Sequence, residues 1–68
     1  YTSGQLGRAL SHFEEAVRIF EAALGPMHPR VAAALGNLGA VRDDLGEPEE
    51  AREHFERALR ILDEAEGT

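Results

Sequence analysis

The chain has 68 residues and no cysteine, so it forms one small domain or a piece of a larger one, without disulfides or thiolate metal sites, and we expect a reducing, cytoplasmic location by default. Its formal net charge of −6 disfavours binding to nucleic-acid phosphates, which requires a clustered basic surface. No long apolar run and no basic-then-apolar leader occurs, and we therefore expect neither a membrane span nor a signal peptide.

A first helix is predicted over residues 5–24. Its large apolar residues are spaced three and four positions apart, which places them on one face of an α-helix. These residues are Leu6, Leu10, Phe13, Val17, Phe20 and Leu24. The helix should end at Gly25, which suits a left-handed C-terminal cap. Pro29 suits the first residue of a following helix, with His28 near its N-cap.

A second helix is predicted over residues 30–45. Its expected inward side consists of Val31, Leu35, Leu38, Val41 and Leu45. Gly36 and Gly39 lie inside this helix, where each glycine costs about 1 kcal/mol relative to alanine. We therefore expect close contact with another helix at these two positions.

A third helix is predicted over residues 48–66, after a turn at Gly46. Pro48 and the following acids suit a first helical turn. The backbone N–H that proline lacks would have no partner within the helix at this position, and the helix dipole favours negative charge there. The expected inward residues are Ala51, Phe55, Ala58, Leu59, Leu62 and Ala65. The predicted fold class is all-α, with three helices arranged as antiparallel helical hairpins.

The chain repeats itself after 42 residues. Ten of the 26 overlapping pairs are identical, among them Ala9/Ala51, His12/His54, Phe13/Phe55, Ala16/Ala58 and Ile19/Ile61. Such a period is typical of stacked repeat proteins, whose units bury their apolar faces against neighbouring units. The offset also aligns the first residues of the chain with the end of the second helix. We therefore interpret residues 1–4 as the last part of a preceding helix.

The second and third helices resemble a tetratricopeptide repeat (TPR). The residues that match the family's W-x2-L-G-x2-Y and A-x3-F-x2-A patterns are Leu38, Gly39, Ala51, Phe55 and Ala58. Leu35 and Arg42 depart from the pattern, because the family has aromatic residues there. The 42-residue unit with its Gly-x2-His-Pro corner is similar to the kinesin-light-chain type of repeat. An arginine-only set of basic residues indicates a GC-rich, bacterial source.

This resemblance implies an α-solenoid scaffold that acts as a non-enzymatic protein–protein interaction module. In the family, the first helix of each pair lines a concave groove that receives peptide or protein segments. The corresponding residues here are Ala33, Gly36, Asn37, Ala40, Asp43 and Asp44. Asn37 matches an asparagine that hydrogen-bonds peptide backbones in relatives. Gly36 and Ala40 replace the basic residues of chaperone-binding relatives, whereas Asp43 and Asp44 favour a basic peptide.

No residue grouping in the sequence indicates catalysis, a cofactor or a metal. His12 and His54 are equivalent positions on different helices, and neither has a second histidine three or four residues away. The acidic runs lack the alternating oxygen ligands and central glycine of a calcium loop. Because no nucleophile–base grouping or phosphate-binding loop occurs, we expect no enzyme activity.

The two copies of the repeat predict unequal ends for the molecule. The leucines Leu6, Leu10 and Leu24 of the first helix correspond to Pro48, Arg52 and Glu66 in the third. We therefore expect a polar, finished outer face on the third helix and an uncovered apolar face on the first. A hypothesis of homo-oligomerisation follows, with or without helix exchange, through Leu6, Leu10, Phe13, Val17 and Phe20. The alternative function is then a structural or oligomerisation element, or the sensory arm of a larger signalling or transcription regulator.

Overall fold

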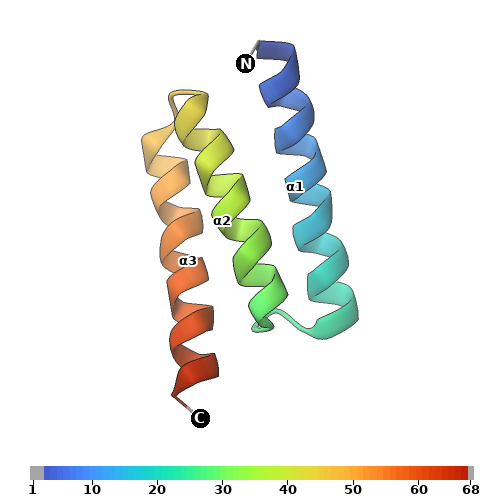
Figure 1. Ribbon diagram of the computed structural model, residues 1–68, viewed down its shortest axis with the longest axis vertical. Helices are drawn as coiled ribbons and strands as arrows, with labels where there is room; N and C mark the ends of the chain where they lie inside the picture. Colours follow the sequence, from blue (N-terminus) through green and yellow to red (C-terminus); the bar gives the residue numbers. More distant parts are fainter. Residues whose placement is uncertain (1–2, 68) are drawn as a thin grey trace.

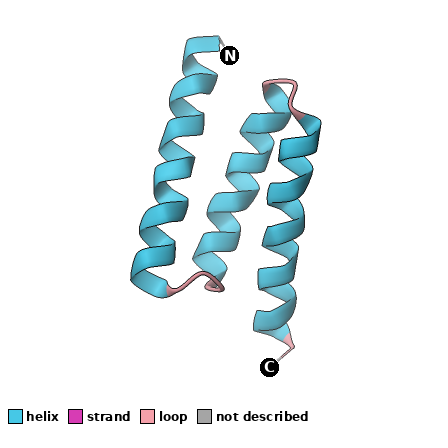
Figure 2. Ribbon diagram, turned by 180° about the vertical axis from the view of Figure 1, so that it is seen from behind, coloured by secondary structure: helices cyan, strands magenta, loops and turns pink. Residues whose placement is uncertain are grey.

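A computed structural model describes residues 3–67 and contains three α-helices within them. Helix α1 spans Ser3–Leu24, α2 spans Pro29–Asp44 and α3 spans Pro48–Glu66. Consecutive helices run antiparallel, and α2 lies between α1 and α3 (Figure 1). Seen from behind, the two connecting loops lie at opposite ends of the molecule (Figure 2). The predicted all-α fold with three helices is confirmed.

The corner between α1 and α2 has the expected caps. Gly25 has a φ of 97°, in the left-handed region that glycine adopts without steric cost. The backbone N–H of Arg30 donates to Nδ1 of His28 at 3.0 Å, so the His28 side chain caps α2. Pro29 is the first residue of α2, where its missing N–H is not needed. These local signals were readable from the sequence and are confirmed.

The start of α1 differs from the expectation for residues 1–4. Ser3 and Gly4 are the first residues of α1, and Tyr1 and Thr2 lie outside the described residues. Gly46, the equivalent of Gly4, has a φ of 78° and precedes a helix that starts at Pro48. A proline keeps the residue before it out of the helical conformation. At the first copy leucine replaces this proline, so Ser3 and Gly4 are free to adopt the helical conformation of α1.

The core is centred on α2, which is buried on two sides. The most deeply buried large side chains are Val31 and Leu35 of α2 and Ile61 of α3. Val17 of α1 belongs to the same cluster, so all three helices contribute to one core. A helix packed between two others needs a broad apolar surface, which explains why alanines of α2 are buried beside its leucines and valines.

The buried face of α3 differs from the predicted one. Ala51, Ala58 and Ile61 are buried, and Ile61 was not among the expected inward residues. Leu59 is 61% exposed, and Phe55, Leu62 and Ala65 are also exposed, so their expected inward placement was wrong. The residues Pro48, Arg52 and Glu66 are exposed as expected, but they share the outer face with these apolar side chains. The reason is the position of the contact: α3 packs on α2 through Ala51, Ala58 and Ile61, which leaves Leu59 and Leu62 on the flank of the helix.

The two glycines inside α2 have different surroundings. A Cβ atom on Gly39 would lie 2.7 Å from Cε1 of Phe55, so this glycine permits close packing of α3 on α2. A Cβ atom on Gly36 would have nothing within 4 Å. Close helix contact is therefore confirmed at Gly39 and wrong at Gly36.

Candidate functional site

The main candidate site is a groove between α1 and α2, which we call the α1/α2 groove. It has a volume of about 340 Å³ and is lined by His12, Phe13, Ala16 and Phe20 of α1 and by Arg30, Ala33, Ala34 and Asn37 of α2. These residues recur three and four positions apart on each helix, and such spacing places them on one helical face. The groove therefore has aromatic and alanine walls with three polar side chains among them.

The six residues predicted for peptide binding lie at the surface of α2. Gly36 is half-buried, and the other five, Ala33, Asn37, Ala40, Asp43 and Asp44, are exposed. Their spacing places them on one face of the helix. Only Ala33 and Asn37 line the α1/α2 groove. The other four continue the same helical face, and the two aspartates lie at the C-terminal end of α2.

The residues predicted for self-association lie mostly against the core. Val17 is buried, and Leu10, Phe13 and Phe20 are half-buried and pack against the core cluster. Leu6 is half-buried as well. Val17 is therefore not available for contact with another molecule, whereas Phe13 and Phe20 reach the α1/α2 groove. The exposed large apolar side chains of α1 are instead Ile19 and Leu24.

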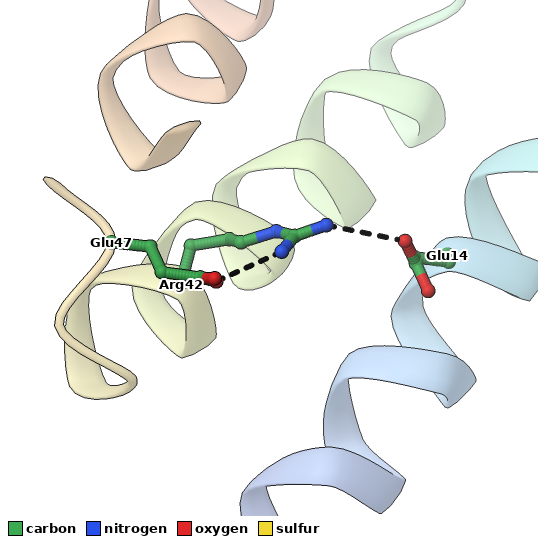
Figure 3. Close-up of polar contacts among 3 residues, drawn as sticks. All are labelled: Glu14, Arg42 and Glu47. Carbon is green, nitrogen blue, oxygen red and sulfur yellow. Dashed lines mark hydrogen bonds and ion pairs between the residues drawn. The ribbon is translucent and has the colours of Figure 1, made fainter. Parts of the chain in front are cut away.

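Arg42 links α1, α2 and the turn before α3. It donates from Nη1 to Glu47 at 2.8 Å and from Nη2 to Glu14 at 3.4 Å (Figure 3). The hydrogen bond with Glu47 raises the pKa of Arg42 above its usual value, although burial acts in the opposite direction. Its Nε atom is buried without a hydrogen-bond partner among the described residues. A second ion pair, between Arg57 and Glu21, joins α3 to α1.

The sequence model of the tetratricopeptide repeat family matches residues 1–64. The chain belongs to the tetratricopeptide repeat family. Comparison with curated proteins and with solved structures gave no match. TPR domains generally mediate protein–protein interactions and are typically non-catalytic, which agrees with the coarse functional prediction.

Arg42 is a departure from the family pattern whose contacts the sequence did not predict. It occupies the second aromatic position of the family pattern, and here its charged group bridges two carboxylates from different segments. The sequence offered one signal, the pair Arg42 and Glu47 across a short turn, but Glu14 is far away along the chain. The contact between Arg42 and Glu14 joins α1 to α2.

Within residues 3–67, no three histidine or acidic side chains are grouped so that they could hold a metal ion. None of the described helices is both long enough and apolar enough to cross a bilayer.

Proposed function

We propose that this TPR chain is a non-enzymatic interaction module that binds a peptide or protein segment along the exposed face of α2. The observation that carries this proposal is the α1/α2 groove. Its walls include Phe13 and Phe20, and Asn37 lies among them with both a donor and an acceptor for a peptide backbone. Apolar surface with a few polar groups is the usual composition of a binding site.

The distribution of charge along α2 favours one orientation of the bound segment. Arg30 lines the groove at the start of α2, and no carboxylate lines the groove. Asp43 and Asp44 are exposed at the other end of the helix. Because opposite charges attract, we propose a segment with an acidic group near Arg30 and a basic group near the two aspartates.

The proposal is tested with short random peptides selected for binding to the chain. The double variant Asn37→Ala/Asp43→Ala should weaken a selected peptide by about fivefold or more, since a lost hydrogen bond costs about 0.5 to 1.5 kcal/mol. Binding is measured by fluorescence anisotropy, and circular dichroism checks the fold. The matched control is Glu64→Ala/Glu66→Ala, which removes exposed acids from the end of α3. Equal weakening by both double variants would contradict the proposal.

We also propose the subtype of the repeat, the source of the protein and its location in the cell. The 42-residue period together with the corner from Gly25 to Pro29 supports the kinesin-light-chain type of repeat. Arginine as the sole basic residue type supports a bacterial source, and the absence of cysteine supports a reducing, cytoplasmic location.

A structural role is the second candidate function, favoured by exposed apolar side chains on both outer helices. Ile19 is 55% exposed on α1, and Leu59 is 61% exposed on α3. Contact between such surfaces on different molecules would produce an oligomer, or would join this chain to a larger signalling or transcription regulator. Sedimentation distinguishes the two candidates. If Ile19→Glu and Leu59→Glu abolish self-association while peptide binding persists, the interaction function does not depend on assembly.

A further inference from the structure

The first backbone donors of α2 all bond to one residue, His28. Its carbonyl oxygen accepts from the N–H groups of Val31 at 2.9 Å and Ala32 at 3.4 Å. Its ring nitrogen Nδ1 accepts from the N–H of Arg30 at 3.0 Å, and Pro29 has no N–H to satisfy. Near the start of a helix such donors have few partners within the helix itself. The N–H of Arg30 therefore depends on the imidazole ring, whereas the other two donors bond to the backbone.

The hydrogen bond with Arg30 requires a neutral His28 ring. A ring nitrogen that accepts a hydrogen bond carries no proton, so the proton of the neutral ring lies on Nε2. In the protonated ring both nitrogens are donors, and Nδ1 can no longer accept. The added positive charge would also lie at the positive end of the helix dipole. Both effects destabilise the first turn of α2 when His28 is protonated.

The charged groups around this corner give the protonated ring no partner. Within residues 3–67, His28 forms no ion pair. On α2 itself, Arg30 carries a charge of the same sign as the protonated ring. On α1, Glu21 is already engaged in its ion pair with α3. On α3, Asp63 and Glu64 line an open depression that His28 does not line. Protonation therefore removes the cap without creating an ion pair.

The start of α3 provides a comparison within the same chain. Its first residue is also a proline, Pro48, but the N-cap residue Glu47 makes no side-chain hydrogen bond to the helix. The Glu47 carboxylate accepts from Arg42 instead. The two helix starts therefore share the proline, and only α2 begins with a cap that a histidine side chain provides.

We propose that His28 makes the corner between α1 and α2 sensitive to acid, so that protonation of its ring uncaps α2 and opens the first turn of this helix. Histidine side chains take up a proton near about pH 6.5. The cap is therefore in place at neutral pH and is lost in mild acid. The opened segment includes Arg30 and ends before Val31, whose side chain is fully buried in the core. The device loosens the connection between two successive helices and leaves the core intact.

The test follows single amides of the chain by NMR hydrogen exchange, each compared with an unstructured peptide at the same pH. Between about pH 7.5 and about pH 5.5, we expect the protection of the Arg30 amide to fall about fivefold, the size of a lost helix cap. The Leu35 amide, inside α2, should keep its protection. Glu49 has the equivalent place in α3 and should show little protection at either pH. The ring nitrogen signals of His28 should show the Nε2–H form at pH 7.5.

Two variants at His28 separate the role of the proton from the role of the cap. His28→Asn keeps an acceptor that does not titrate, so the protection of Arg30 should persist at both pH values. His28→Ala should leave Arg30 unprotected at both. The matched control His12→Asn should behave as the unmodified chain does.

Several outcomes would overturn the inference. One is an Arg30 amide whose protection does not change with pH in the unmodified chain, and another is an Nδ1–H ring at pH 7.5. A third is a His28→Asn variant that keeps the pH dependence. If Leu35 loses protection together with Arg30, the whole chain unfolds in acid and the cap is not the cause. None of these outcomes bears on peptide binding through Asn37, so the proposed function is tested separately.

Discussion

His54 and His12 are equivalent residues with different environments. Burial lowers the pKa of His54 below its ordinary value of 6.5, and the positive charge of Arg42 acts in the same direction. Arg57 also lowers this pKa, whereas Glu53 and Glu14 raise it. The folded state therefore favours neutral His54, although two carboxylates lie near it. The repeat pairs the two histidines as equivalent residues and so gave no sign of their different environments, because desolvation depends on what packs around the side chain.

The lowered pKa of His54 predicts a loss of stability on acidification. Its contribution to folding is fully present above pH 6.5 and is lost as the pH falls below 6.5 towards the folded-state value. We expect the thermal midpoint of the chain to decrease as the pH is lowered from about 7.5 to about 5.5. His54→Gln should make this decrease smaller. Thermal unfolding followed by circular dichroism measures both midpoints. His12→Gln is the matched control, and identical pH profiles for the two variants would contradict the prediction.

At the scale of the helices, the packing of α3 on α2 depends on which positions of α2 are small. Gly39 permits the approach of Phe55, whereas Gly36 faces open space. Both glycines looked alike in the sequence, where each is an unfavourable residue inside a helix. Gly39 follows Leu38 in the family pattern, whereas Gly36 lies at no defined position of that pattern. This match was the one feature of the sequence that distinguished the two glycines.

The two glycines give a matched pair of substitutions. Gly36→Ala should stabilise the chain by about 0.5 to 1 kcal/mol, because alanine is the better helix former and meets no neighbour. Gly39→Ala should be less stable than Gly36→Ala by about 1 to 3 kcal/mol, because its new methyl group forces the Phe55 ring to move. Urea unfolding measures the difference. Equal stabilisation by the two alanines would show that Phe55 is not held against Gly39.

At the scale of the whole molecule, α1 is held to the other helices by a shared core and by ion pairs at its polar edge. The molecule measures 41 × 23 × 14 Å between its outermost Cα atoms, so every helix has much of its surface in water. Arg42 and Arg57 both reach carboxylates of α1. Partly buried ion pairs contribute more than exposed ones, since solvent screens them less.

Removal of the Arg42 side chain should therefore lower the stability of the three-helix fold. We expect Arg42→Ala to lower the free energy of unfolding by about 1 to 2 kcal/mol, because Glu14 and Glu47 both lose a charged donor. The matched control is Arg52→Ala, which breaks only an exposed pair with Glu56 within α3 and should change stability by less than about 0.5 kcal/mol. Chemical denaturation measures both variants. A larger effect at Arg52 than at Arg42 would contradict this role.

The sequence by itself determined the local structure of this protein. The three- and four-residue spacing of apolar side chains, the left-handed glycines and the prolines at the helix starts act within a few residues, so they predicted three helices and the corner at Gly25. The internal repeat and the family pattern indicated the TPR class without any knowledge of the contacts between helices. The six surface positions of α2 could likewise be proposed from the pattern, although their role in binding remains a prediction.

Only the tertiary structure decided which of two identical side chains is buried. Ile19 and Ile61 have the same chemistry and equivalent positions, yet α2 covers one and leaves the other in water. In the same way, the structure placed Val17 in the core, although the comparison of the two copies predicted an uncovered face there, and it left Leu59, an expected inward residue, at the surface. Helical periodicity shows which side chains share a face, but burial depends on the neighbouring helix, and that contact is made between residues distant in the chain.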